Sequence, residues 1–218
     1  MNFKERVASV AIAQAPLFKS VFIDYEYLIC SDAFIANDYY ILSAHEDNYQ
    51  HLVGVNTPNL SPEAFFQRCL AGTLTEADID FDKPGRLEKD IKGAVRKKIN
   101  GLPFYTGMME KELVAQENFT KNNVICSIAA TDRSMTIGYI NNRVAVPKSL
   151  LNGDRLDNDK ASRVELIIRR PAGGRLFSEL VFGDGEALGK YRDKIGTLID
   201  PCLLELCGGG NMREEKSA

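Results

Sequence analysis

The sequence predicts an α+β fold, in which a curved antiparallel β-sheet packs against helices in a single domain. Segments rich in β-branched and aromatic residues occur in two groups, and helical segments separate and follow them. Repeated βαβ units are missing, which disfavours a doubly wound parallel sheet. Of the 218 residues, 44% are hydrophobic and 26% are charged, as in soluble globular proteins. We expect the domain to span residues 1–207 and a mobile polar tail to span 208–218.

The first half of the chain predicts a helix, three strands and a second helix. Residues 3–20 show helical spacing of apolar positions, and we expect this helix to end near Pro16. Ser61 and Pro62 form the start of the second helix, and Gly72 closes it. Between the two helices, β-branched and aromatic runs predict strands at 21–30, 39–43 and 51–55.

The second half predicts a longer helix, further strands and a last helix. Residues 82–84 open the long helix, and Gly101 with Pro103 ends it. Pro201 lies inside the last predicted helix, 186–206, so we expect a break there. Strands are predicted at 123–130, 135–141, 144–146, 163–170 and 175–182, with a short helical turn at 147–151.

The charge is small overall but unevenly distributed along the chain. The 27 Lys and Arg residues and 30 Asp and Glu residues give a net charge of -3, which disfavours a protein that binds nucleic acid over its whole surface. Residues 24–82 carry eleven acids and one base, residues 83–98 carry a net +5, and residues 160–175 carry a net +4. A local basic site is therefore compatible with the sequence, and the two basic segments can converge in the fold.

The long predicted helix carries a basic face. Lys89, Lys92 and Arg96 are spaced i, i+3 and i+7, so they share a face opposite the apolar stripe. Several cations on one face create the positive field that a phosphate backbone requires. Lys97 and Lys98 follow directly and make the run denser. The alternative is a solvated face that pairs with the acidic segment of the same chain.

The two histidines differ in their predicted surroundings. Histidine is the side chain best suited to general acid–base chemistry near neutral pH. His51 opens the predicted strand 51–55, where it can reach a ribose or a phosphate from the edge of the sheet. The alternative is a half-exposed structural histidine. His45 lies in a predicted loop, where a structural role is the simpler interpretation.

Metal and cofactor motifs have little support, so we expect neither group. The five cysteines are scattered and form no C-x-x-C pair, which is typical of reduced thiols in a cytoplasmic protein. Asp78, Asp80 and Asp82 alternate, but the glycine and the glutamate of an EF-hand loop are missing. We expect no membrane segment, because the apolar runs are far shorter than the roughly 18 residues that a span needs.

Two segments resemble a known nuclease family. The run 47–55, with His51-Leu52-Val53-Gly54, and the run 61–74, with Phe65-Phe66 and Leu70-Ala71-Gly72-Thr73-Leu74, resemble the barnase–EndoU–colicin–RelE-like (BECR) nucleases of phages and other mobile elements. The basic helix stands where that family has one, and residues 147–151 follow a later strand as in the family. The resemblance covers about 20–155.

The resemblance implies a metal-independent endoribonuclease, acting as a toxin or mobile-element effector. In such enzymes a base removes the proton of the ribose 2′-hydroxyl, an acid protonates the leaving 5′-oxygen, and cations stabilise the phosphorane. Single-stranded or structured RNA is then the substrate, and an inhibitor or immunity protein is a possible partner. The expected catalytic residues are His51, Lys98 and Thr131, and the expected substrate-binding residues are Lys89, Lys92, Arg96, Lys97, Ser134 and Lys148.

The chain departs from this pattern in two ways. Its net charge is negative, and His51 is its one convincing catalytic histidine, so the second proton-transfer group has to be a lysine, a tyrosine or a carboxylate. The alternative hypothesis is a non-catalytic regulatory protein of mobile-element type that binds protein or nucleic acid. The acidic segment 24–82, which suits a basic partner, favours that alternative.

Overall fold

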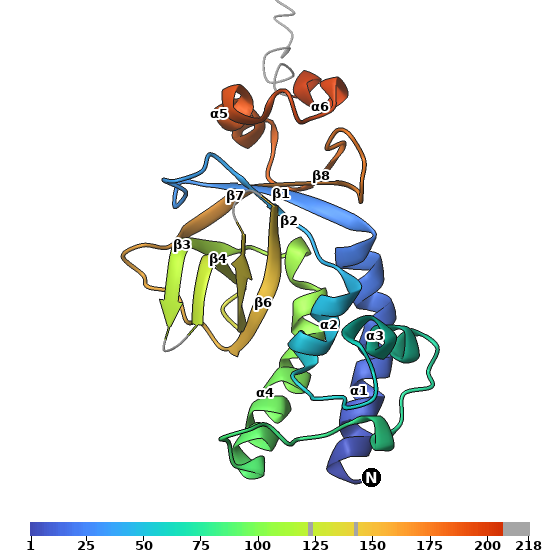
Figure 1. Ribbon diagram of the computed structural model, residues 1–218. Helices are drawn as coiled ribbons and strands as arrows, with labels where there is room; N and C mark the ends of the chain where they lie inside the picture. The colour runs from blue at the N-terminus through green and yellow to red at the C-terminus, as the bar shows by residue number, and fades with distance from the viewer. Residues whose placement is uncertain (122–123, 142–143, 207–218) are drawn as a thin grey trace, which may run out of the picture.

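A closed β-barrel forms the centre of the protein (Figure 1). The computed structural model describes residues 1–121, 124–141 and 144–206, and the predicted tail lies outside them. Within this described part, the strand order β1–β2–β6–β5–β4–β3–β7 closes through pairing of β7 with β1, and β8 pairs with β7. The strands are β1 Tyr25–Ser31, β2 Tyr40–Leu42, β3 Val114–Lys121, β4 Val124–Thr131, β5 Met135–Ile140, β6 Val144–Asn152, β7 Ser162–Pro171 and β8 Glu179–Phe182.

The closure makes the fold more specific than the predicted curved sheet. The α+β class and the single domain agree with the prediction, but β1 pairs with β7, as in Leu28 opposite Ile168, and joins the two ends of the sheet. One pair is also parallel, since Ile41 of β2 lies opposite Val144 of β6. Closure pairs the strand edges that an open sheet leaves exposed. Pairing between strands this far apart in sequence leaves no local signal, so the sequence pattern did not predict it.

Four helices pack against the barrel and share its main core. They are α1 Phe3–Phe18, which continues into the π-helical turn η1 Lys19–Ile23, then α2 Glu46–Val53, α3 Pro62–Leu70 and α4 Glu88–Thr106, with short 3-10 turns η2 Glu76–Asp78 and η3 Met108–Glu110. Tyr49 of α2 is fully buried, and its ring centroid lies 5.0 Å from that of Phe18 and 5.2 Å from that of Phe66. This aromatic cluster fixes α2 between α1 and α3.

The last two helices, α5 Gly185–Ile195 and α6 Pro201–Glu205, cover the opposite face of β1 and β7 (Figure 1, top). Leu28 and Ile168 of these strands pack in one buried cluster with Leu188 and Tyr191 of α5. Since helices or core cover both of its faces, β1 is an almost continuous run of apolar residues.

The predicted strand 51–55 is wrong, because His51 lies in the last turn of α2. Local signals explain the helix. The backbone N–H of His45 donates to Oδ1 of Asn48 at 2.8 Å, and acidic residues occupy the first turn, where they complement the helix dipole. Gly54 ends the helix in a left-handed conformation with φ 86°. His51 is exposed, and Leu52 and Val53 are both buried, so the burial pattern is that of a helix face and not the alternation of a strand.

The predicted helical turn at 147–151 is also wrong, because these residues belong to β6. The pairing of β6 with β5 steps from Pro147 to Ser149 and leaves Lys148 as an extra residue in a β-bulge. A bulge tolerates a proline, which has no N–H to donate to the ladder, and it redirects the neighbouring side chain.

Two helix ends that were predicted at prolines are wrong. The first helix continues past Pro16 to Phe18, and α4 continues past Pro103 to Thr106. In both cases buried side chains beyond the proline, such as Phe18, belong to the main core, and their packing outweighs one lost hydrogen bond. The long helix also starts later than predicted, at Glu88. The predicted break at Pro201 is confirmed, since it is the first residue of α6.

The segment Phe3–Ile23 is long and apolar enough to cross a membrane by length and composition, in contrast to the expectation from its short apolar runs. In the structure its buried residues, among them Val7, Ala11 and Ala15, lie in the main core. One face of the segment therefore packs in the main core, and 33% of its apolar window is buried.

We predict that Tyr49→Phe lowers the free energy of unfolding by about 1 kcal/mol. The Tyr49 hydroxyl is buried and donates to the carbonyl oxygen of Ala11 at 2.6 Å, so the change removes one hydrogen bond between α2 and α1 without changing the ring packing. Urea denaturation of both proteins measures the difference. An unchanged midpoint would show that this hydrogen bond does not hold α2 in place.

Candidate functional site

The C-terminal end of α2 is where His51 and Lys98 meet. The carbonyl groups of a helix's last turn lack intrahelical partners and carry partial negative charge. Lys98 Nζ lies 2.6 Å from the carbonyl oxygen of His51, and Lys83 Nζ lies 3.4 Å from that of Gly54. A Cβ at Gly54 would lie 2.6 Å from Cδ of Lys98. Glycine is therefore needed both for the left-handed cap and for the passage of the lysine.

His51 keeps an exposed face but lies among cations. Burial lowers the pKa of His51 from its ordinary value of 6.5, and the charge of Lys98 lowers it further. A hydrogen bond with the backbone of Lys148 acts in the opposite direction. A histidine with a lowered pKa is mostly uncharged at neutral pH, so His51 is able to accept a proton.

Lys98 is the second group with a changed pKa. Burial lowers the pKa of Lys98 to about 8, and the charge of Lys83 contributes to the shift. A lysine with this pKa is mostly protonated at pH 7 and still able to transfer a proton. The structure thus brings two of the three predicted catalytic residues, His51 and Lys98, together, although it moves His51 from a strand to a helix.

A basic cavity of about 370 Å³ lies next to Lys98, between α4 and the barrel. Four cations line it, from two different elements and one loop: Lys97, Lys98, Lys121 and Arg155. No acidic side chain is among the described residues of its lining, which suits a phosphate group. The remaining lining residues are Ala94, Val124, Ser149, Leu150, Leu151 and Asn152.

The loop after β6 positions Arg155 at this cavity. The buried hydroxyl of Thr136 donates to the carbonyl oxygen of Gly153 at 2.8 Å and accepts from the backbone N–H of Arg155 at 3.0 Å. The guanidinium Nε of Arg155 also donates to the carbonyl oxygen of Asn152 at 2.8 Å. These contacts fix both the backbone and the side chain of the arginine.

The predicted basic face of α4 does not line the basic cavity. Of the predicted cations on this helix, Lys97 and Lys98 line it. The guanidinium of Arg96 instead lies over the ring of Phe3, 5.0 Å from the centroid. The residues of the predicted face that stand outside the lining are Lys89, Lys92 and Arg96.

Thr131 and Ser134 shape the hairpin between β4 and β5. Thr131 is buried, and its hydroxyl donates to the carbonyl oxygen of Met135 at 2.7 Å and accepts from the N–H of Arg133 at 2.9 Å. The Ser134 hydroxyl donates to Asp132 at 2.5 Å. Both side chains are engaged within the turn and are absent from the described lining of the cavity.

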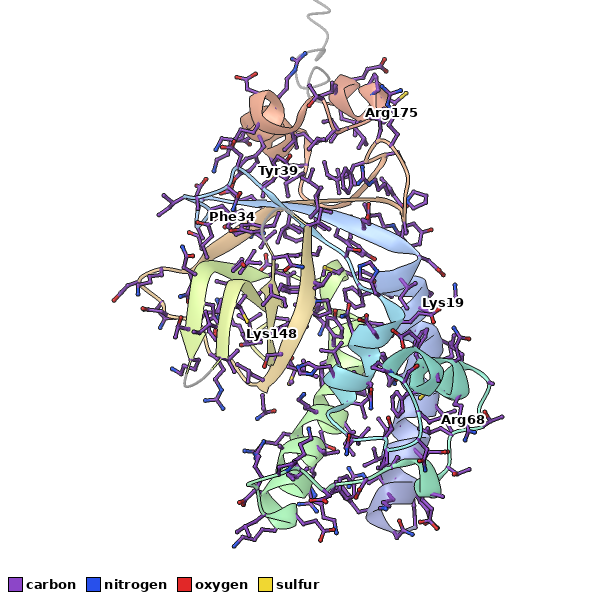
Figure 2. The ribbon with its side chains drawn as sticks, in the orientation of Figure 1. Lys19, Phe34, Tyr39, Arg68, Lys148 and Arg175 are labelled. Atoms are coloured by element: carbon purple, nitrogen blue, oxygen red, sulfur yellow. The ribbon has the colours of Figure 1, made fainter. Side chains whose placement is uncertain are left out.

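Lys148 lies on the barrel beside the site (Figure 2). It is the extra residue of the β6 bulge, its backbone is hydrogen-bonded to His51, and its Nζ lies 3.3 Å from the carbonyl oxygen of Ile125. The structure therefore groups Lys148 with His51 and Lys98. Sequence reasoning missed Lys121, Thr136 and Arg155 as site residues, because each is isolated in the sequence from the basic run that drew attention.

A family model matches residues 12–162 of the chain: the phage-Barnase-EndoU-ColicinE5/D-RelE like nuclease 4. The chain belongs to this nuclease family. The match confirms the resemblance found from the sequence, and it includes His51, Lys98 and every described residue that lines the basic cavity. No curated protein and no solved structure matched the chain.

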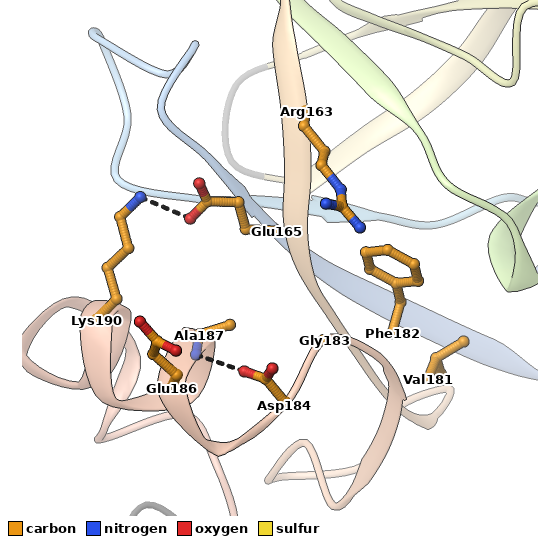
Figure 3. Close-up of a pocket in the computed structure, with 9 residues that line it drawn as sticks. All are labelled: Arg163, Glu165, Val181, Phe182, Gly183, Asp184, Glu186, Ala187 and Lys190. Atoms are coloured by element: carbon orange, nitrogen blue, oxygen red, sulfur yellow. Dashed lines mark hydrogen bonds and ion pairs between the residues drawn. The ribbon is translucent and has the colours of Figure 1, made fainter.

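A larger cavity, of about 830 Å³, lies largely outside the residues matched by the nuclease family (Figure 3). Its lining mixes charges of both signs, among them Arg163, Glu165, Asp184 and Lys190. Two of these residues are paired within the cavity wall, since Lys190 Nζ lies 2.6 Å from Glu165. Charges that are already paired attract a phosphate less strongly than the cations of the basic cavity, whose described lining has no acidic side chain.

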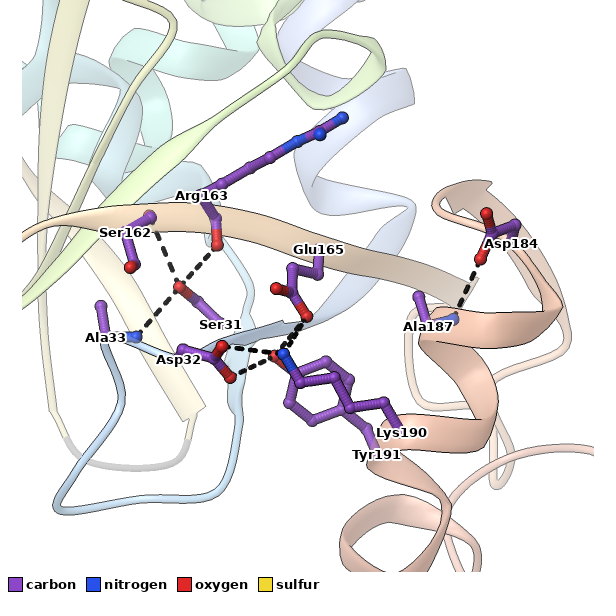
Figure 4. A network of polar contacts seen from close by, with 10 residues as sticks. All are labelled: Ser31, Asp32, Ala33, Ser162, Arg163, Glu165, Asp184, Ala187, Lys190 and Tyr191. Atoms are coloured by element: carbon purple, nitrogen blue, oxygen red, sulfur yellow. Dashed lines mark hydrogen bonds and ion pairs between the residues drawn. The ribbon is translucent and has the colours of Figure 1, made fainter.

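The paired charges belong to a polar network that attaches α5 to the barrel (Figure 4). Lys190 contacts both Asp32 and Glu165, and the hydroxyl of Tyr191 contacts the same two carboxylates at 3.1 and 2.9 Å. Burial, followed by the hydrogen bond with Glu165, raises the pKa of Tyr191. This network explains how the C-terminal helix is held and assigns it a structural role.

We predict that Lys98→Met raises the pKa of His51. The methionine keeps most of the side-chain volume but removes the neighbouring cation that disfavours the protonated imidazole. An NMR titration of the imidazole C–H signals of both proteins measures the change, with His45 as a second signal in the same sample. A His51 pKa that is unchanged or lower in the variant would contradict this account of the pair.

Proposed function

We propose that this nuclease cleaves RNA without a metal ion, at the pair formed by His51 and Lys98. The observation that carries the proposal is the placement of two proton-transfer groups, with pKa values below 6.5 and about 8, beside a cavity lined by four cations. Acid–base catalysis is most effective when the pKa values lie close to the working pH.

The reaction uses the ribose 2′-hydroxyl as the nucleophile. Its oxygen attacks the adjacent phosphorus, the bond from phosphorus to the 5′-oxygen breaks, and the products carry a 2′,3′-cyclic phosphate and a 5′-hydroxyl. His51, uncharged at neutral pH, accepts the 2′-hydroxyl proton. Lys98, mostly protonated at neutral pH, donates to the leaving oxygen. Both protons are then accounted for.

The cations of the site stabilise the phosphorane. Lys97 lines the basic cavity beside Lys98, and Lys148 stands next to His51. Preorganised cations near developing negative charge lower the barrier without reorganisation during the reaction. The other predicted cations of α4 act through the long-range field, which salt screens.

A second candidate function is the binding of a basic protein, such as an inhibitor, without catalysis. An acidic cavity of about 560 Å³ beside the start of α2 favours it, since Glu26, Glu46, Asp47 and Glu63 line this cavity. Glu26 already pairs with Arg170 at 2.7 Å, which leaves Glu46, Asp47 and Glu63 to attract a basic partner. Tight, salt-sensitive binding without RNA cleavage would favour this candidate.

We predict that the purified protein cleaves a mixed-sequence single-stranded RNA in excess EDTA, and that His51→Ala slows cleavage by about 10²–10⁴-fold. His45→Ala is the matched control and is expected to cleave as the wild type does. If wild type and His51→Ala cleaved at equal rates, His51 would not be a catalytic residue. Cleavage that needs an added divalent metal would contradict the proposed mechanism.

We also predict a bell-shaped dependence of kcat/KM on pH. Activity falls on the acid side as His51, with its lowered pKa, gains a proton, and it falls on the alkaline side near pH 8 as Lys98 loses one. Lys98→Arg keeps the charge but titrates far above this range, so the alkaline limb is expected to move upward. An alkaline limb that stays near pH 8 in this variant would show that another group donates the proton.

A further inference from the structure

A second, polar cavity of about 630 Å³ adjoins the basic cavity. The two cavities share Lys121, at the end of β3, and Arg155, in the loop after β6. These two cations therefore stand between the cavities and face both. Residues from α4, β3, β6 and this loop thus form one track that begins beside His51 and Lys98 and leads away across the barrel.

The chemistry of the lining changes along this track. The basic cavity combines its cations with apolar side chains, among them Leu150 and Leu151. The polar cavity keeps cations, Lys160 together with the shared Lys121 and Arg155, and adds amide and carboxylate side chains: Gln116, Asn118, Asp157, Asn158 and Asp159. Cations suit the phosphates of a polynucleotide, an apolar surface suits the faces of its bases, and amides and carboxylates suit the polar edges of the bases.

We propose that this track binds a single-stranded RNA segment several nucleotides long, on one side of the cleaved bond. The inference rests on the proposed function, because it takes His51 and Lys98 as the place of cleavage. The basic cavity holds the first nucleotide beyond that bond, Lys121 and Arg155 hold the next phosphate, and the polar cavity holds a further base.

The recessed basic cavity between α4 and the barrel selects unpaired RNA. Bases reach a cavity of about 370 Å³ between a helix and a barrel only when they are unstacked and splayed outward. In a duplex the same bases are stacked inside the helix, and their polar edges are already paired. A duplex contacts the cations with its phosphates alone and loses the contacts with the polar cavity.

The test measures binding to the catalytically disabled variant His51→Ala by fluorescence anisotropy. The probes are a dinucleotide and an octanucleotide of single-stranded RNA, and a hairpin duplex of the octanucleotide sequence. We expect the octanucleotide to bind at least about tenfold more tightly than the dinucleotide and than the duplex, since stacking and phosphate contacts each add about 1 kcal/mol or more. Equal binding of the duplex, or no gain with length, would overturn the proposal.

A second variant locates the track. Arg155→Gln, added to His51→Ala, is expected to weaken octanucleotide binding about tenfold more than dinucleotide binding, because Arg155 stands between the cavities. Lys194→Gln is the matched control, since this lysine lies on α5 and pairs with Asp38. An equal loss of affinity for both oligonucleotides would show that Arg155 acts only through its long-range positive charge, and it would overturn the track.

The outcomes separate this proposal from the proposed function. Length-dependent, single-strand-selective binding by a wild type that does not cleave RNA would support the track and contradict the nuclease mechanism. The opposite result is also informative. If the wild type cleaves RNA but His51→Ala binds the octanucleotide no more tightly than the dinucleotide, the mechanism is supported and the track is contradicted.

Discussion

The hydrogen bond from Lys98 to the last turn of α2 is the contact on which the candidate site depends. The open carbonyl groups of a helix end need donors, and α4 supplies one from a lysine whose stem passes Gly54. Burial lowers the pKa of Lys98, and burial together with the charge of Lys98 lowers the pKa of His51. The need of the α2 carbonyl groups for a donor therefore brings together two groups that titrate on either side of neutral pH.

The barrel determines what surrounds this pair. Strand β6 pairs with β2 and β5, carries Lys148 in a bulge and packs against α4, so it connects His51 to the basic cavity. A Cβ at Gly101 would overlap the side chain of Met135, so glycine allows α4 to approach β5 closely. The residues of the proposed RNA track all lie within the part of the chain that matches the nuclease family, residues 12–162. The later helix α5 packs on the opposite side of β1 and β7, through its own buried cluster and polar network.

The sequence predicted the class of the fold and the family, because these depend on local patterns. It also named His51 and Lys98, which the structure places in contact. The cap at Gly54 and the acids of the first turn are local signals that predict α2 as a helix. The prediction instead followed the short apolar run after His51 and assigned a strand. The face of α4 that lines the cavity could not be predicted from the sequence. Helical spacing shows which residues share a face, but it does not show which face lies next to the barrel. Lys121 and Arg155 were missed for a different reason: they converge only after the barrel closes, and no local signal marks either residue.

The central claim is that cleavage uses the ribose 2′-hydroxyl and two protein groups. The most direct test is a DNA oligonucleotide that contains one ribonucleotide, incubated with the protein in excess EDTA and analysed by mass spectrometry. The account predicts cleavage only after the ribonucleotide, with a 2′,3′-cyclic phosphate on one product and a 5′-hydroxyl on the other. Cleavage at deoxynucleotides, or products that carry a 5′-phosphate, would show that water attacks the phosphorus and would contradict the account.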